Sequence, residues 1–289
     1  MRIVVFGGAG QLGLEIQRRA EDLNFEVISP VISEVDIADA DQVKFLLERS
    51  RPNLIINCAA YTNVDKAEEE KELAYRINVV GAANVATRAA ALNARFIHIS
   101  TDFVFDGKLG RPLTEEDKPH PLSVYGKTKY EGELEILRVA PKQALIVRTS
   151  SLHGAQGNNF VHAMLKAIRE RSEVRVVSDR MMSVTWAGWL AEAVLDLGRL
   201  DCVGIVHASC AGEVTWFGFA QEIFELVKPT MPRAKEVKLQ PVLGSEYPLP
   251  AARPDYSVFD LSKITKLLGR KPIIWQQGLR QHLKELSLV

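Results

Sequence analysis

Tyr125 and Lys129 are the residues of this sequence whose types and spacing most directly suggest chemistry. They stand four residues apart in a segment with helical periodicity, and positions i and i+4 of a helix share a face. An ammonium group beside a phenol favours the phenolate, so a tyrosine that normally titrates near about 10 could exchange protons closer to neutral pH. We therefore expect Tyr125 to protonate a carbonyl oxygen, although the same spacing also occurs by chance on helix surfaces.

A glycine-rich turn follows the first apolar run of the chain, residues 3–6. Its glycines have the spacing Gly-x-x-Gly-x-x-Gly, and residues 11–22 after them have helical periodicity. Glycines here permit a tight turn and a close approach of the backbone to a pyrophosphate, which a helix N-terminus attracts. The strand-turn-helix context therefore predicts dinucleotide binding rather than a simple turn. We expect the cofactor turn to comprise Gly7, Gly10, Gln11, Leu12 and Gly13.

The type of dinucleotide is left open by the second apolar run, which ends in Ile28-Ser29-Pro30. It offers neither an acid for a ribose 2′-hydroxyl nor an arginine for a 2′-phosphate, so NADP(H) and NAD(H) both fit. Asp36 and Ile37 are candidates for the adenine edge of the cofactor site. Asp36 would equally suit the cap region at the start of the next helix.

Two further strand ends carry candidate site residues. The third run is followed by Ala59, Ala60 and Tyr61, where small residues would let a nicotinamide ribose lie on the backbone, or would simply pack against helices. The fourth run ends in Ser100 and Thr101, which places hydroxyls at the carboxyl edge of the sheet, where open α/β sheets bind ligands. We expect Thr101 to hydrogen-bond the reacting carbonyl; its alternative role is to cap a loop.

Apolar runs alternate with helical periodicity to about residue 210, which is the βαβα rhythm of a parallel sheet covered on both faces. We expect an α/β fold, a Rossmann-type doubly wound parallel sheet with a smaller C-terminal substrate-binding lobe. Residues 1–150 would form the dinucleotide-binding domain, and the sheet rhythm, including a strand at 174–177, would continue to about 210. The lobe would come from 151–289, mainly 151–172 and 211–289.

The composition argues against several classes of function. Thirty-six basic residues balance thirty-six acidic ones, so no overall field would recruit nucleic acid or an anionic membrane. No apolar run reaches membrane-spanning length, and the start of the chain lacks the h-region of a signal peptide. Three cysteines without a Cys-x-x-Cys pair suit a reducing cytoplasm, and the six histidines form no metal-binding motif. We expect a cytoplasmic protein without a metal, either a monomer or a homodimer.

Several longer motifs together resemble the dTDP-4-dehydrorhamnose reductase family of extended short-chain dehydrogenase/reductases. They are the glycine turn, the segments 59–68, 100–107 and 125–129, the loop 157–160 and the tripeptide 252–254. The resemblance covers essentially the whole chain. It implies NAD(P)H-dependent reduction of the C4 keto group of a nucleotide-activated 6-deoxy-4-keto sugar, in particular the step that gives dTDP-L-rhamnose.

The resemblance also implies roles for individual residues. Tyr125 would be the proton donor, Lys129 would hold the nicotinamide ribose and lower the pKa of the tyrosine, and Thr101 would steady the substrate oxygen. The nucleotide-sugar side would involve Thr101, Asp102, Asn159, Phe160 and Arg253. Sugar-nucleotide 4,6-dehydratases of the same superfamily carry an Asp-Glu pair after the threonine, whereas here Asp102 is followed by Phe103. The missing second acid favours reduction over loss of water.

The chain departs from the family pattern on the substrate side. Residues 148–153 read Arg-Thr-Ser-Ser-Leu-His instead of Arg-Thr-Ser-Trp-x-Tyr, and 179–185 read Asp-Arg-Met-Met-Ser-Val-Thr instead of Asp-Gln-x-x-x-Pro-Thr. Some family members carry acids at a magnesium-bridged dimer interface; Glu15 fits one, but Gly188 stands where another is expected, so we predict no such metal. Two alternatives stay open: a reductase or epimerase of a different sugar nucleotide, and a non-catalytic NAD(P)-binding regulatory subunit.

Overall fold

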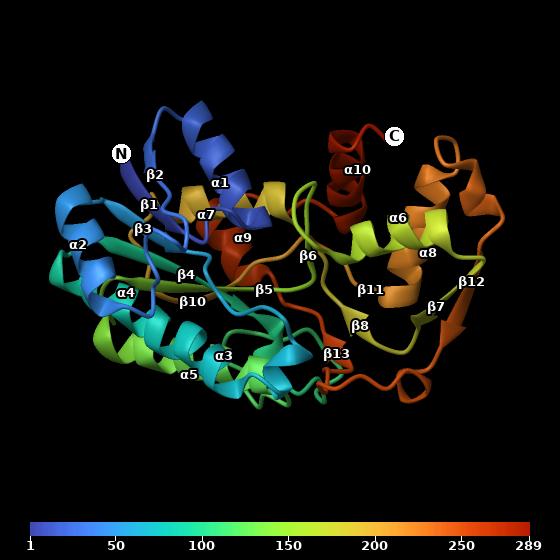
Figure 1. Ribbon diagram of the computed structural model, residues 1–289, viewed down its shortest axis with the longest axis horizontal. Helices are drawn as coiled ribbons and strands as arrows, with labels where there is room; N and C mark the ends of the chain where they lie inside the picture. The colour runs from blue at the N-terminus through green and yellow to red at the C-terminus, as the bar shows by residue number, and fades with distance from the viewer.

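The computed structural model describes residues 1–289 and is built around a parallel sheet (Figure 1). Its strands are β1 (Arg2–Phe6), β2 (Glu26–Ile28), β3 (Leu54–Asn57), β4 (Arg95–Thr101), β5 (Ala144–Thr149) and β10 (Gly204–His207). These six strands are all parallel and lie in the order β10-β5-β4-β3-β1-β2. The order reverses direction beside β1, and open α/β sheets bind their ligands at such a switch point.

Helices cover both faces of this sheet because successive residues of a strand point to opposite faces. In β1, Ile3 and Val5 pack into one core while Val4 and Phe6 pack into the other. The first core is closed by α1 (Gln11–Asp22), α7 (Ala187–Leu197) and α9 (Ser262–Leu268), and the second by α2 (Ala40–Ser50), α4 (Ala82–Ala91) and α5 (Val124–Val139). Figure 1 shows these two helix layers on either side of the strands. The predicted doubly wound parallel sheet is confirmed.

A second group of elements forms a lobe beside the sheet, on the right of Figure 1. Its helices are α6 (Phe160–Glu170), α8 (Trp216–Val227) and α10 (Trp275–Glu285), with the short turns η4 (Pro232–Lys235) and η5 (Gly244–Glu246). Its strands are the parallel pair β7 (Glu173–Val177) and β12 (Lys238–Val242), and the three-stranded group β8 (Met181–Met182), β11 (Val214–Thr215) and β13 (Tyr256–Ser257). Where the chain passes between sheet and lobe, β6 (Leu152–His153) pairs with β9 (Thr185–Trp186).

One predicted strand belongs to a different sheet from the one expected. The strand predicted at 174–177 exists as β7, but it pairs with β12 of the lobe and not with the central sheet. Local periodicity identifies a strand but does not identify its partner, which here comes from a segment some sixty residues later in the chain. The exact domain boundaries expected from the sequence stay a prediction.

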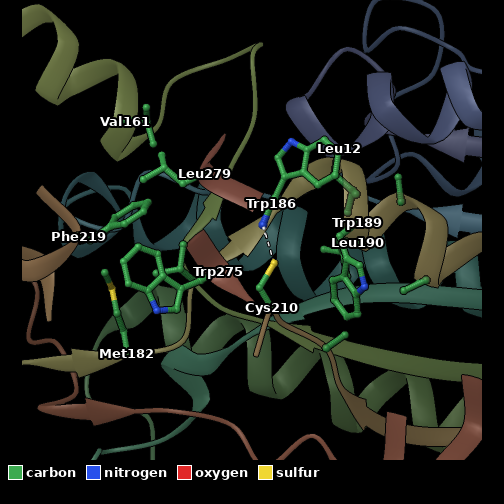
Figure 2. Close-up of a cluster of buried hydrophobic side chains, with 14 of the residues drawn as sticks. Leu12, Val161, Met182, Trp186, Trp189, Leu190, Cys210, Phe219, Trp275 and Leu279 are labelled. Carbon is green, nitrogen blue, oxygen red and sulfur yellow. Dashed lines mark hydrogen bonds between the residues drawn. The ribbon is translucent and has the colours of Figure 1, made fainter. Parts of the chain in front are cut away.

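The lobe and the sheet share one apolar core, which Figure 2 shows in close-up. Phe219 and Trp275 from lobe helices enter the same core as Trp186 and Leu190 beside the sheet, and the Trp186 backbone N–H donates to Cys210 Sγ at 3.5 Å. Full burial of a large apolar side chain stabilises a fold by roughly 1.5–3 kcal/mol. The lobe is therefore held firmly against the sheet, which gives any cleft between them fixed walls. Every helix is too short or too polar to cross a membrane.

Short helical segments pack against α5, the helix that carries Tyr125 and Lys129. They are η1 (Lys66–Glu68), α3 (Lys71–Tyr75), the π-helical η2 (Arg76–Gly81) and, after β4, η3 (Asp102–Val104). α5 itself begins at Ser123, whose hydroxyl accepts the N–H of Gly126 at 3.1 Å. This cap satisfies one of the free N–H groups of the first turn, so the helix starts just before the tyrosine.

Two glycines let α5 lie directly against neighbouring backbone. A Cβ on Gly126 would stand 2.2 Å from the carbonyl oxygen of Phe103, and one on Gly132 would stand 2.2 Å from the carbonyl oxygen of Asn78. Any larger residue at either position would push the helix away from η3 or η2. These close approaches fix the height of α5 above the sheet, and with it the positions of the side chains that α5 carries toward β4.

A buried ion pair joins α5 to the sheet. Glu133 on α5 and Arg148 on β5 are each only 1% exposed, with Arg148 Nη2 at 2.6 Å and Nε at 3.0 Å from the carboxylate. Ser100 on β4 also donates to Glu133, and the guanidinium lies 5.1 Å from the ring centre of Phe105. Because both charges are removed from water, each depends on the other for compensation.

Removal of one partner of this pair should cost far more than removal of an exposed pair on the same helix. We expect Glu133→Ala to lower the free energy of unfolding by about 3–5 kcal/mol, because it leaves the Arg148 guanidinium buried without its carboxylate. Glu135→Ala, which breaks the exposed pair with Arg138, is the matched control and should change stability little. Urea unfolding of both variants measures the difference, and equal losses would contradict the argument.

Candidate active site

A cleft of about 510 Å³ opens at the carboxyl edge of the sheet, between the sheet and the lobe. Its walls combine the glycine turn, the segments after β3 and β4, the start of α5 and the loop before α6. Of the predicted site residues, the cleft brings together Gly7, Gly10, Gln11, Leu12, Gly13, Ala60, Thr101, Asp102, Tyr125 and Lys129. Cofactor-type and reaction-type residues therefore meet in one space, as the sequence predicts.

The glycine turn has the geometry that a pyrophosphate site needs. Gly7 has a φ of +74°, and a Cβ there would stand 2.5 Å from the backbone nitrogen of Ala59. A Cβ on Gly13 would stand 2.4 Å from the carbonyl oxygen of Gly7. Helix α1 begins at Gly10 without a side-chain cap or an acid in its first turn, so its free N–H groups face no competing carboxylate. The turn fits a dinucleotide pyrophosphate at the N-terminus of α1.

The other predicted cofactor contacts lie at the margins of the cleft. Asp36 pairs with Arg76 and accepts the N–H of Ala38 at 2.9 Å, and Ile37 is buried in the core beneath α4. The N-cap of α2 is Asp39, and Asp36 lies in the cap region just before it, where its N–H donates to Gln42 Oε1 at 2.9 Å. Neither Asp36 nor Ile37 lines the cleft, and their contact with an adenine stays a prediction.

Of the predicted residues after β3, only one lines the cleft. Ala60 lines the cleft, whereas the backbone of Ala59 packs against Gly7 and its N–H is held by Asn57 Oδ1 at 3.0 Å. The Tyr61 hydroxyl turns outward to Glu70, at 2.5 Å. The packing alternative for these residues therefore holds for Ala59, and only Ala60 is placed against the space for a cofactor.

Tyr125 lies in the first turn of α5 and faces the cleft. Burial raises the pKa of its hydroxyl to about 12; a hydrogen bond with Thr101 opposes this rise, and the Asp102 carboxylate adds to it. The aromatic ring packs edge-on against Phe103 at 5.5 Å between ring centres. In the free protein the pKa of Tyr125 is therefore higher than normal, and the lowering expected from Lys129 is wrong.

The reason is the direction of the lysine side chain. Lys129 Nζ donates to the carbonyl oxygen of Ile99 at 2.6 Å and lies 3.0 Å from His98 Nε2, both on β4. Burial lowers the pKa of Lys129 to about 8, and Glu133 acts against that shift. The predicted i,i+4 spacing on one helix is present, but the amine is held by the sheet.

Thr101 and Asp102 form a small polar group at the end of β4. Thr101 Oγ1 donates to Asp102 Oδ1 at 3.1 Å and accepts the N–H of Phe103 at 3.2 Å, so it caps η3 while lining the cleft. Asp102 Oδ2 accepts from Ser150 Oγ at 2.8 Å. Burial raises the pKa of Asp102 against these hydrogen bonds. Both readings of Thr101, a cap and a cleft residue, are therefore met by one side chain.

Three of the predicted substrate-side residues, Asn159, Phe160 and Arg253, take structural positions and do not line the cleft. Asn159 caps α6, accepting the N–H of His162 at 3.1 Å and donating to Gly154 at 2.8 Å. Phe160 packs against Trp216 and Phe219 in the lobe.

Arg253 makes a two-point ion pair instead of facing the open cleft. Its Nη1 and Nη2 stand 3.1 and 2.8 Å from the two oxygens of Asp65, and Nη1 also donates to the Ala251 carbonyl. The hydrogen bond from Arg253 lowers the pKa of Asp65. This pair ties the proline-rich loop of the lobe to the segment after β3, which is one wall of the cleft.

Several cleft residues were not among the predicted site residues. They are Cys58, Thr62, Val64, Ile99, Ser100, Phe103, Thr149, Ser151, Leu152, Gly157 and Asn158. The segment 148–153 was visible in the sequence as a departure from the family pattern, and Ser151 and Leu152 within it indeed face the cleft. Gly157 and Asn158 stand directly before the predicted Asn159, in the loop that the sequence identified.

The fold and this cleft define an oxidoreductase of the short-chain dehydrogenase/reductase type that takes a nicotinamide dinucleotide. The family described as RmlD substrate binding domain matches residues 1–288, and the chain belongs to it. The family resemblance inferred from the sequence is confirmed.

Full-length relatives support this membership. The chain is 38% identical to the spore coat polysaccharide biosynthesis protein SpsK of Bacillus subtilis (strain 168), over 99% of this chain and 98% of the relative. It is 36% identical to the dTDP-4-dehydrorhamnose reductase of Escherichia coli (strain K12), over 99% of this chain and 98% of the relative.

Solved structures agree with the sequence relatives. A dTDP-4-dehydrorhamnose reductase from Clostridium acetobutylicum superposes with a TM-score of 0.93 at 38% identity, covering 99% of this chain and 100% of that one. The Bacillus anthracis dTDP-4-dehydrorhamnose reductase in complex with NADP gives 0.92 at 36%, covering 98% and 99%. A Thermus thermophilus UDP-glucose 4-epimerase gives 0.83 at 19% over 99% of each chain, which shows a common fold.

The glycine turn can be tested without any substrate. We expect Gly13→Ala to weaken NADPH binding by at least about tenfold, or about 1.4 kcal/mol, because the added Cβ would collide with the backbone of Gly7 and reshape the turn. Leu14→Ala, the next position on the same helix and exposed, is the matched control. Calorimetric titration with NADPH measures both affinities, after circular dichroism has shown that both variants are folded. Equal NADPH affinities would show that the glycine turn is not part of the binding site.

Proposed function

We propose that this protein reduces the C4 keto group of dTDP-4-dehydro-L-rhamnose with NADPH and so forms dTDP-L-rhamnose. Full-length similarity to several proteins named dTDP-4-dehydrorhamnose reductase supports the substrate, and the NADP complex of one such relative supports the cofactor. The observation that carries the proposal is the meeting of Thr101, Tyr125 and Lys129 with the glycine turn in one cleft.

The proposed chemistry assigns the proton to Tyr125. A bound reduced nicotinamide supplies the hydride to the carbonyl carbon. As negative charge develops on the carbonyl oxygen, the Tyr125 hydroxyl donates its proton to that oxygen. The Thr101 hydroxyl, which donates to Asp102 in the free protein, would turn from Asp102 to donate a hydrogen bond to the same oxygen. With its pKa raised to about 12, Tyr125 stays protonated at neutral pH, which is the state that a proton donor requires.

The acids of the cleft support reduction rather than loss of water. Asp102 is the only carboxylate that lines it. Its two oxygens are occupied by the hydroxyls of Thr101 and Ser150, and the next residue is Phe103. Elimination of water needs an acid and a base at the sugar, and a single, already bonded carboxylate supplies no such pair.

Within this class of enzymes, a different sugar nucleotide is the alternative to the proposed substrate. Ser151 lines the cleft where the family pattern has a tryptophan, and Leu152, at the variable position after it, lines the cleft as well. Arg180 lies outside the cleft beside Asp255, at 3.5 Å. The assignment of Asn159, Phe160 and Arg253 to the nucleotide side stays a proposal, in which Arg253 would bind the diphosphate while held by Asp65. A cytoplasmic location is also proposed.

Replacement of Tyr125 separates catalysis from binding. We expect Tyr125→Phe to lower turnover of dTDP-4-dehydrorhamnose by about 10²–10⁴-fold, since the proton donor is lost, while NADPH affinity is retained. Tyr130→Phe on the same helix, outside the cleft, is the control and should keep its activity. Loss of NADPH absorbance measures turnover. If the native protein binds NADPH but never oxidises it with this substrate, the regulatory-subunit alternative replaces the enzyme.

A panel of 4-keto sugar nucleotides tests the substrate itself. We expect dTDP-4-dehydro-L-rhamnose to give the highest kcat/KM, because the similarity to reductases of this substrate extends over the whole chain. The same assay with UDP-linked and epimeric 4-keto sugars, each with NADPH and NADH, provides the comparison. A higher kcat/KM for another nucleotide sugar would establish the alternative that the altered segment 148–153 suggests, an enzyme that acts on a different sugar nucleotide.

A further inference from the structure

Behind the cleft, two buried polar side chains connect Lys129 to the interior of the sheet. Asn57 at the end of β3 and His98 in β4 are register partners in the parallel ladder, so their side chains leave the sheet on the same face. Asn57 is 0%, His98 1% and Lys129 2% exposed. Neither Asn57 nor His98 lines the cleft, and the proposed chemistry uses neither.

The orientation of the Asn57 amide is fixed by the backbone. Its Oδ1 accepts the N–H of Ala59 at 3.0 Å, which leaves its Nδ2 facing His98 Nδ1 at 3.2 Å. An amide nitrogen can only donate, so His98 Nδ1 must accept. A neutral imidazole has one donor and one acceptor nitrogen, and its proton is then on Nε2. Burial holds the pKa of His98 well below its usual value, which keeps the ring neutral.

The tautomer of His98 determines whether Lys129 is a neutral amine or a charged ammonium group. His98 Nε2 lies 3.0 Å from Lys129 Nζ, and a protonated Nε2 donates to it. Only a neutral amine has a lone pair that can accept this bond. The same Nζ donates to the carbonyl oxygen of Ile99 at 2.6 Å, which an amine can do at the same time.

We propose that His98, oriented by Asn57, is a positioning residue that stabilises the neutral amine of Lys129 in the free protein and thereby sets the pH at which it becomes charged. Charging Lys129 requires His98 Nε2 to become an acceptor and the ring proton to move to Nδ1. Asn57 must then rotate its amide and give up the N–H of Ala59. That N–H belongs to the backbone that packs on Gly7, so the charge of Lys129 is linked to the wall of the cofactor turn.

The other titratable groups around Lys129 do not replace this control. Glu133, one turn later on α5, favours the charged amine at a distance, but its carboxylate is taken up by Arg148 and Ser100. Cys58, after β3, stays a thiol, since burial raises its pKa to about 12. Tyr125 on the same helix stays a phenol. Only His98 and a backbone carbonyl contact Nζ directly.

The tautomer of His98 is the direct test, and it requires neither substrate nor turnover. In protein labelled with 15N-histidine, two-bond 1H–15N spectra recorded above the Lys129 pKa of about 8 should show His98 protonated on Nε2. His98→Gln assigns the signals; if that variant does not fold, contacts with the neighbouring Phe96 ring assign them. A His98 ring protonated on Nδ1 in the native protein would overturn the proposal.

The second test replaces Asn57 by aspartate, which has the same shape but no N–H donor, and so reverses the hydrogen bond to His98. In Asn57→Asp both oxygens accept, so His98 should carry its proton on Nδ1, and its Nε2 should accept from an ammonium group of Lys129. We expect His98 to switch tautomer and the alkaline limb of kcat/KM to move upward by about one pH unit, which is a tenfold gain in proton affinity.

Only the activity measurement depends on the proposed reductase reaction. In that reaction the charged form of Lys129 is the active one, so activity falls as the pH rises through the pKa of Lys129. The matched control is Asn78→Asp. Asn78 is another buried amide, bonded to Thr128 of α5 at 3.0 Å, with no contact to His98. Equal shifts in the two variants would mean that any buried negative charge suffices, and would overturn the role of His98. A reaction that fails on every substrate leaves the spectra unaffected, so the two proposals fail separately.

Discussion

The close packing of helix α5 on the carboxyl half of the sheet is the constraint on which the site depends. Gly126 and Gly132 admit the backbones of Phe103 and Asn78 to distances that no side chain would permit. Lys129 and Glu133 on α5 are only 2% and 1% exposed, so these inward-facing polar groups of the helix need partners in the sheet. The positions of Tyr125 and Lys129 follow from this packing as much as from their spacing.

Two parallel links meet that requirement. His98 and Ser100 are alternate residues of β4 and face α5, while Lys129 and Glu133 are one turn apart on α5 and face β4. The first link holds the lysine, and the second holds the carboxylate together with Arg148. Lys129 is thereby placed in a buried polar network, where its charge state depends on the positions of neighbouring protons.

The architecture could be predicted from the sequence because it rests on local patterns. The glycine turn, the alternation of apolar runs with helices, and the ends of β3 and β4 are visible within short segments, and each appears where predicted. The partner of β7 and the ion pair of Arg253 with Asp65 could not be predicted, because each joins segments far apart in the chain. The direction of Lys129 was missed for the same reason, since helical spacing says nothing about a histidine on the strand below.

The raised pKa of Tyr125 keeps its hydroxyl protonated before reduction begins. Reduction starts from a protonated tyrosine, because the alkoxide that forms is a stronger base than phenolate and takes the proton readily. Oxidation of an alcohol would start from the phenolate, which burial and Asp102 make scarce. A charged lysine would be needed chiefly after the proton has left, to stabilise the phenolate that remains. A lysine held as an amine until its surroundings rearrange therefore suits a reductase, since it leaves the donor protonated until the proton is required.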